Sequence, residues 1–118
     1  MKQRSIKERE FEDYLRDILD SMEKAQHFVE NLPYKQFAVD DKTIFAVVRA
    51  LEIIGEATKK IPDDIRKSNP DIPWKEMAGM RDVLVHDYIG VDLETVWLTV
   101  TEKIPEAKPM IQKLLTKQ

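Results

Sequence analysis

The stretch IFAVVRALEIIGEA, residues 44–57, is apolar on almost every face of the helix that it predicts. An ordinary surface helix carries one apolar stripe and buries only that stripe. A helix that is apolar nearly all round has to be buried on two sides, and in a small domain the second side is often covered by another chain. The stretch therefore predicts the central helix of an all-α fold and favours a homodimer.

Capping residues and a proline predict where the first helix and the central helix begin and end. Ser5 and Glu8 have capping-box spacing, so the first helix is expected to start there and to end at Pro33. The central helix is expected to begin at an N-cap at Asp40 or Asp41 and to run to about Lys60. The predicted stripe of the first helix consists of Phe11, Tyr14, Leu15, Ile18, Met22, Ala25, Val29 and Leu32.

Prolines interrupt the region that follows. Pro62, Pro70 and Pro73 indicate short helical turns and loops, and residues 79–89 then predict a helix that Gly90 ends. No segment alternates with a period of two for long enough to predict a strand.

The last helix is predicted to begin after an N-cap at Asp92. Pro105 and Pro109 lie inside its apolar stripe, so we expect a kink or a restart near Ile104. Together these patterns predict one domain, residues 1–118, folded as an up-and-down bundle of four to five helices. The stripe consists of Leu93, Val96, Trp97, Val100, Ile104, Ala107, Ile111 and Leu114.

Composition excludes several classes of function. The chain has no cysteine, which rules out disulfides and thiolate metal sites and favours a cytoplasmic protein. It has no glycine-rich phosphate loop, no HExxH or ExxH pair and no stretch of membrane-spanning length, so no metal, cofactor or membrane is expected. The net charge of −3 means that any contact with RNA or DNA must come from a local basic patch.

The stretch RDVLVHDY, residues 81–88, carries the chemistry that remains. His86 can take or give a proton near neutral pH, and Arg81 can hold a phosphate and stabilise negative charge. These two groups suffice for metal-free RNA cleavage, in which a base activates a ribose 2′-hydroxyl, a cation stabilises the transition state and an acid protonates the leaving 5′-oxygen. The alternative is structural: a capping or buried histidine, and an Arg81 that pairs with Asp82 or Glu76.

Helical geometry restrains the catalytic interpretation. At about 100° per residue, a spacing of five leaves Arg81 and His86 roughly 140° apart, whereas Tyr88 nearly shares the face of Arg81. His86 lies over Asp82 instead. The two groups converge on one phosphate only if the helix unwinds before Gly90 or a two-fold dimer brings two copies of the stretch together.

Three charged residues interrupt the apolar surface of the central helix. Arg49, Glu52 and Glu56 line up on one edge at spacings of three, four and seven. They are either a solvated, self-paired stripe or the wall of a cleft or interface.

The spacing Arg81, four residues, His86, one residue, Tyr88 resembles the RX4HXY signature of the HepT-like toxins in the HEPN superfamily. Two blocks, AVVRALEIIGEATKKIP at 46–62 and IPWKEMAGMRDVLVHDYIGVDLETVW at 72–97, extend this resemblance over nearly the whole chain. The resemblance implies a dimeric HEPN bundle whose two motifs face a shared cleft.

The resemblance also implies an activity and a partner. It implies a metal-independent ribonuclease, the toxin of a toxin–antitoxin pair, with Arg81 and His86 as the catalytic residues. A nucleotidyltransferase (MNT-type) antitoxin is implied to transfer AMP onto Tyr88 and to form a complex with the homodimer or a higher hetero-oligomer. The candidate cleft-lining residues are Asp82, Arg49, Glu52 and Glu56. The alternative is a non-catalytic helical module that binds the nucleotidyltransferase.

Overall fold

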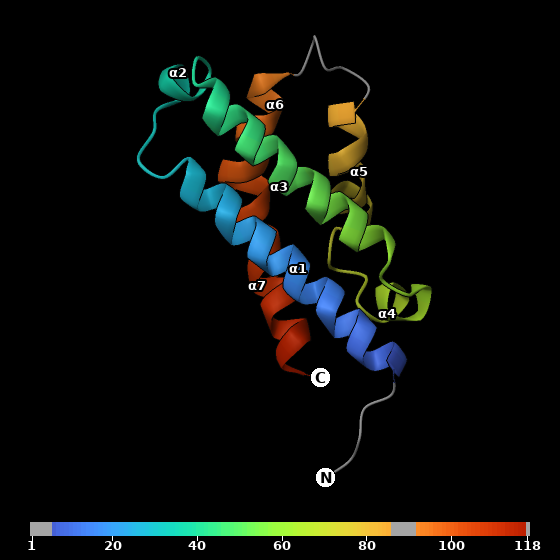
Figure 1. Cartoon of the computed structure of the whole chain (residues 1–118). Coiled ribbons are helices and arrows are strands. Elements are labelled where there is room, and N and C mark those ends of the chain that lie inside the picture. Colours follow the sequence, from blue (N-terminus) through green and yellow to red (C-terminus); the bar gives the residue numbers. More distant parts are fainter. Residues whose placement is uncertain (1–5, 86–91, 118) are drawn as a thin grey trace.

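The computed structural model describes residues 6–85 and 92–117, with the backbone alone for 6–9 and 82–85. This part of the chain contains no strand and forms four long helical segments and two short ones (Figure 1). The predicted all-α bundle of four to five helices is therefore confirmed. The long segments are α1 (Ile6–Phe28), α3 (Asp41–Lys59), α5 (Trp74–Val85) and a continuous run of α6 (Leu93–Leu98), the π-helical turn η1 (Thr99–Lys103) and α7 (Ile104–Thr116); the short ones are α2 (Tyr34–Phe37) and α4 (Asp63–Ser68).

Helix α3 is the centre of the bundle, as its apolar circumference predicts. It packs against α1 on one side and α5 on the other, and α7 packs against α1 (Figure 1). The second apolar side of α3 is thus covered by α5 of the same chain. The apolar pattern therefore does not by itself require a second copy, and the homodimer stays a prediction. The buried residues of α3 are Val47, Ala50, Leu51, Ile54, Gly55, Ala57 and Thr58.

Aspartate caps begin two of the long helical segments at the predicted positions. The carboxylate of Asp40 accepts hydrogen bonds from the Thr43 hydroxyl at 2.7 Å and the Thr43 backbone N–H at 3.1 Å. These bonds to Thr43 hold the pKa of Asp40 below its ordinary value. Asp92 makes the corresponding bonds to Thr95, and they lower its pKa in the same way. Both caps satisfy backbone donors that the first turn of a helix leaves free.

Two predicted boundaries are wrong. The first helix ends at Phe28 rather than at Pro33, because Asn31 adopts a left-handed conformation with φ 62° that a helix cannot continue. Helix α5 begins at Trp74 rather than at residue 79, directly after Pro73, whose carbonyl accepts from a backbone N–H in the first turn. The motif-bearing helix is therefore longer than its sequence pattern predicts.

The predicted irregularity near Ile104 is present as a π-helical turn. The backbone N–H of Ile104 donates to the Thr99 carbonyl, five residues back instead of four. Pro105 follows at once, and its ring would clash with the carbonyl four residues before it in a regular α-helix. The wider turn accommodates the proline without breaking the segment, so Val100 and Ile104 both stay in the core.

Helices α3 and α5 approach each other closely at Gly55. A methyl group on Gly55 would lie 2.7 Å from Cβ of Arg81 and 2.8 Å from its backbone nitrogen. Neither atom is the free end of a flexible side chain, so one helix would have to move. The absence of a side chain at Gly55 therefore sets how closely Arg81 lies against α3.

We predict opposite effects of alanine at two glycines in the middle of helices. Gly55→Ala is expected to lower the free energy of unfolding by about 1–3 kcal/mol, because overpacking outweighs the gain in helix propensity. Gly79→Ala is the matched control, since a methyl group there meets nothing within 4 Å. It should stabilise the protein by about 0.5–1 kcal/mol. Urea denaturation at one protein concentration measures both, and equal effects of the two variants would contradict the close approach.

Candidate functional site

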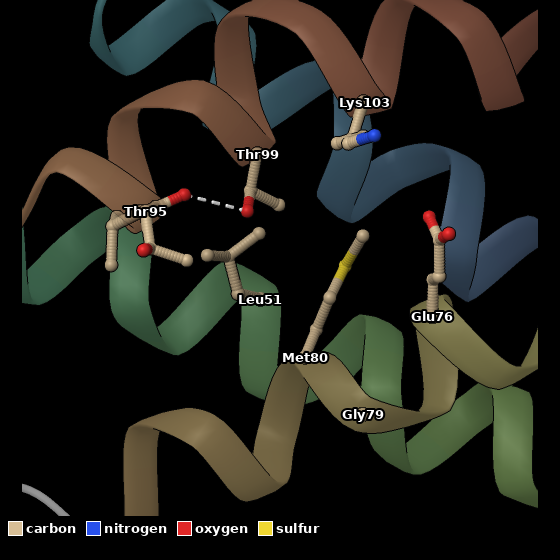
Figure 2. Close-up of a pocket in the computed structure, with 8 residues that line it drawn as sticks. Leu51, Glu76, Gly79, Met80, Thr95, Thr99 and Lys103 are labelled. Atoms are coloured by element: carbon tan, nitrogen blue, oxygen red, sulfur yellow. Dashed lines mark hydrogen bonds between the residues drawn. The ribbon is translucent and has the colours of Figure 1, made fainter. Parts of the chain in front are cut away.

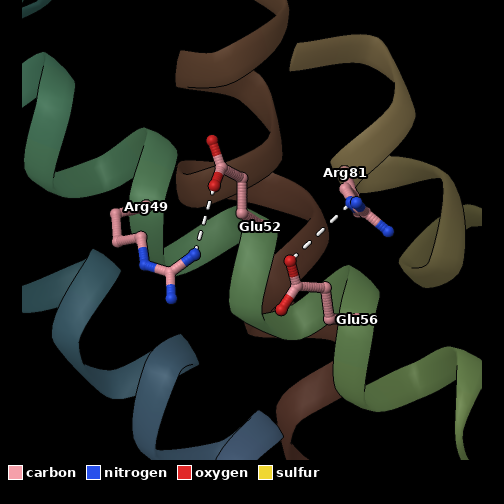
Figure 3. Close-up of polar contacts among 4 residues, drawn as sticks. All are labelled: Arg49, Glu52, Glu56 and Arg81. Carbon is pink, nitrogen blue, oxygen red and sulfur yellow. Dashed lines mark hydrogen bonds and ion pairs between the residues drawn. The ribbon is translucent and has the colours of Figure 1, made fainter. Parts of the chain in front are cut away.

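Arg81 is the one residue of the predicted catalytic pair whose side chain the structure describes. It lies near the end of α5 with 45% of its side chain exposed, and its Nε is 3.7 Å from Oε1 of Glu56 on α3 (Figure 3). The sequence pattern suggested Asp82 or Glu76 as its partner, and the side chain of Asp82 is not among those described. The ion pair that the structure describes is with a residue 25 positions earlier, which the packing of α5 onto Gly55 brings opposite.

The charged stripe of α3 continues from this ion pair. Arg49 donates to Glu52 at 3.2 Å, and with Glu56 and Arg81 these side chains form what we call the polar row (Figure 3). An arginine lies at each end of the row, and the two glutamates lie between them. Both arginines are substantially exposed, so the row is open to solvent on the outer side of α3 and α5.

The guanidinium of Arg81 has unused hydrogen-bond donors. It contacts Glu56 through Nε, and its terminal nitrogens make no hydrogen bond to any residue that the structure describes. At 3.7 Å and with both side chains about half exposed, this ion pair is weak. An anion approaching from solvent could therefore engage the guanidinium in bidentate fashion without first breaking a strong bond.

The other motif residues fall outside the described side chains. His86 and Tyr88 lie outside the described residues altogether, and only the backbone of Asp82 is described. Their convergence with Arg81 therefore stays a prediction. The chain's other histidine, His27, is highly exposed on α1 and lies 3.3 Å from Glu30, as expected of a surface residue.

An apolar pocket of about 290 Å³ lies on the opposite side of α5, facing the C-terminal helical segment (Figure 2). The sequence pattern did not predict it, because its apolar residues resemble ordinary core positions. The Met80 side chain points toward it, and the Thr99 hydroxyl at its wall is satisfied by the Thr95 carbonyl at 2.7 Å. The pocket therefore has room for a small apolar group, and the Thr99 hydroxyl at its wall is already hydrogen-bonded within the protein. It is lined by Leu51, Glu76, Gly79, Met80, Thr95, Val96, Thr99 and Lys103.

The described residues offer neither a metal cluster nor a membrane-spanning helix. Among the side chains of residues 10–81 and 92–117, no three histidine or acidic groups gather closely enough to hold a metal ion. Over residues 6–85 and 92–117, no helix combines the length and the apolar character needed to cross a membrane.

Comparison with known proteins identifies the class. The family model described as "Ribonuclease HepT-like" matches residues 18–114. The chain belongs to this family of HepT-like ribonucleases, in agreement with the resemblance of its motif.

Individual relatives are similar over almost their full length. The chain is 50% identical to "Probable ribonuclease HepT" of Thermococcus cleftensis over 106 residues, 90% of this chain and 96% of the relative. It is 49% identical to "Putative RNase MJ1216" of Methanocaldococcus jannaschii over 107 residues, 91% of this chain and 88% of the relative. No solved structure matches the chain.

We predict that the polar row contributes little to stability. Arg49→Gln and Glu56→Gln should each change the free energy of unfolding by less than about 1 kcal/mol, because exposed ion pairs gain little over solvation. Urea denaturation at low and high salt measures the effect. A loss of 2 kcal/mol or more for either variant would instead make the row a structural element.

Proposed function

We propose that this protein is a metal-independent endoribonuclease that acts as the toxin of a toxin–antitoxin pair. Two findings support the proposal: membership of the HepT-like ribonuclease family, and an arginine of the RX4HXY motif held at the surface. The exposed guanidinium of Arg81, tethered only weakly to Glu56, is the observation that carries it.

The reaction needs a base, a cation and an acid. A base takes the proton of a ribose 2′-hydroxyl, the 2′-oxygen attacks the adjacent phosphorus, and the bond to the 5′-oxygen breaks as an acid protonates that oxygen. The products are a 2′,3′-cyclic phosphate and a 5′-hydroxyl end. Arg81 stabilises the charge that builds on the phosphorane-like transition state, and His86 provides the proton transfer.

The site is proposed to be completed by a second copy of the chain. A histidine from each copy would supply the base and the acid, and two arginines would double the positive charge around the phosphate. The support is geometric: Arg81 and His86 are five positions apart, a spacing that places them on different faces of a straight helix. The polar row adjoins Arg81 and would form part of the wall of this cleft.

Regulation is proposed to act on Tyr88. A nucleotidyltransferase antitoxin transfers AMP from ATP onto the tyrosine oxygen and releases pyrophosphate. The adduct places a phosphate near Arg81 and so neutralises the cation that the scissile phosphate needs. The antitoxin and the modification are inferred from the family resemblance of the motif.

Cleavage of RNA by the isolated protein tests the proposed activity. The purified protein, free of antitoxin, should cleave RNA in EDTA and leave 2′,3′-cyclic phosphate ends. His86→Ala should lower the rate by about 10²–10⁴-fold and Arg81→Ala by about 10²–10³-fold. His27→Ala, which removes the exposed histidine of α1, is the control and should retain full activity.

Labelled RNA and end-group analysis measure this cleavage. Full activity in His86→Ala would remove His86 from the mechanism. Absence of cleavage by the wild type, together with a tight complex with the nucleotidyltransferase, would favour the non-catalytic binding module instead.

The mass of the co-expressed protein tests the proposed transfer of AMP onto Tyr88. Co-expression with an active antitoxin should raise the intact mass of the protein by one or more AMP units and suppress RNA cleavage. Tyr88→Phe, which lacks the acceptor oxygen, should keep its unmodified mass. An unchanged wild-type mass in the presence of antitoxin and ATP would contradict this role of Tyr88.

A further inference from the structure

We propose that a basic groove between α4 and α5 is a second phosphate-binding site for the RNA substrate, next to the site of cleavage. The inference rests on the proposed function, because it assigns the groove to the same substrate. This α4–α5 groove is shallow, with a volume of about 600 Å³. It is lined by Asp63, Arg66, Lys67, Trp74, Lys75, Ala78 and Gly79.

The charge of the groove is opposite to that of the chain. Three cations, Arg66, Lys67 and Lys75, line it against a single acid, Asp63, in a protein of net charge −3. Lys67 and Lys75 are exposed and form no ion pair with any described residue. Two exposed ammonium groups at one hollow form the local basic patch that a polyanion requires of an acidic protein.

Arg66 adds a third donor group that is only partly satisfied. One terminal nitrogen of its guanidinium pairs with Asp63. Its Nε is buried and has no hydrogen-bond partner among the described residues. Because an unsatisfied buried donor is costly, the side chain gains from any acceptor that enters the groove and lets the guanidinium reorient.

The groove lies on the same helix as Arg81. Lys75 precedes Arg81 by six residues, about 9 Å along the helix axis. Ala78 and Gly79 line the groove and have almost no side chain, so a nucleic-acid backbone can approach α5 closely beside the lysines.

The walls of the groove favour phosphate over base. Trp74 is buried, and its indole N–H donates to the Asn69 carbonyl at 3.0 Å, so the ring is held in place and offers no stacking surface. The cations are thus the groups available to a ligand. Such a site holds the backbone of single-stranded RNA without reading its sequence.

The test removes the two free lysines together. In Lys67→Gln/Lys75→Gln, binding of a 2′-O-methyl oligonucleotide, which cannot be cleaved, should weaken about tenfold by fluorescence anisotropy. The plot of log affinity against log salt should become shallower by about 1.4, because each lost phosphate contact in a single strand contributes about 0.7. With cleavable RNA, KM should rise while kcat stays within about twofold of the wild type.

The matched control is Lys113→Gln/Lys117→Gln, which removes two exposed lysines at the end of α7. An equal loss of affinity in this control would show that only net charge matters and would contradict the proposed binding role of the groove. If the wild type cleaves RNA but the groove variant keeps its affinity and salt slope, the binding role is also contradicted, while the proposed ribonuclease function is unaffected.

The remaining outcomes separate the two proposals. If oligonucleotide binding depends on Lys67 and Lys75 but the protein never cleaves RNA, the binding role of the groove is supported and the proposed function is contradicted. If the wild type binds no oligonucleotide, the binding role of the groove is contradicted.

Discussion

The contact between α3 and α5 at Gly55 is the constraint on which the rest of the site depends. A methyl group there would meet the backbone nitrogen and Cβ of Arg81 well inside contact distance. Because Gly55 has no side chain, α5 lies close enough to α3 for Arg81 to reach Glu56. Packing, rather than the ion pair, therefore fixes the arginine, since a half-exposed pair at 3.7 Å is too weak to position a helix.

Much of the bundle could be predicted from sequence because its determinants are local. The caps at Asp40 and Asp92 act within three residues, and the effect of Pro105 falls on the turn directly before it. The wrong helix boundaries arose where another residue ended or began a helix before the expected one. Asn31 ended α1 before the proline that was expected to do so, and Pro73 started α5 earlier than its apolar pattern indicated.

The candidate site was less predictable because its contacts are not local. Arg81 pairs with a glutamate on another helix, while sequence spacing offered only neighbours on its own helix. The α4–α5 groove likewise combines residues from two elements that no spacing rule connects. By contrast, the assignment of the family followed from the motif itself and agrees with the family match over residues 18–114.

The apolar pocket next to Met80 gives the two sides of α5 different surroundings. Toward α3 the helix rests on close-packed atoms, and one added methyl group at Gly55 would already clash with Arg81. Toward the C-terminal segment it lines an open, largely apolar pocket of about 290 Å³, next to a methionine side chain whose rotatable bonds let it change shape. Larger side chains can therefore be accommodated on the pocket side of α5 but not on the side toward α3. Arg81 is carried by this same helix, and the closely packed side sets its position.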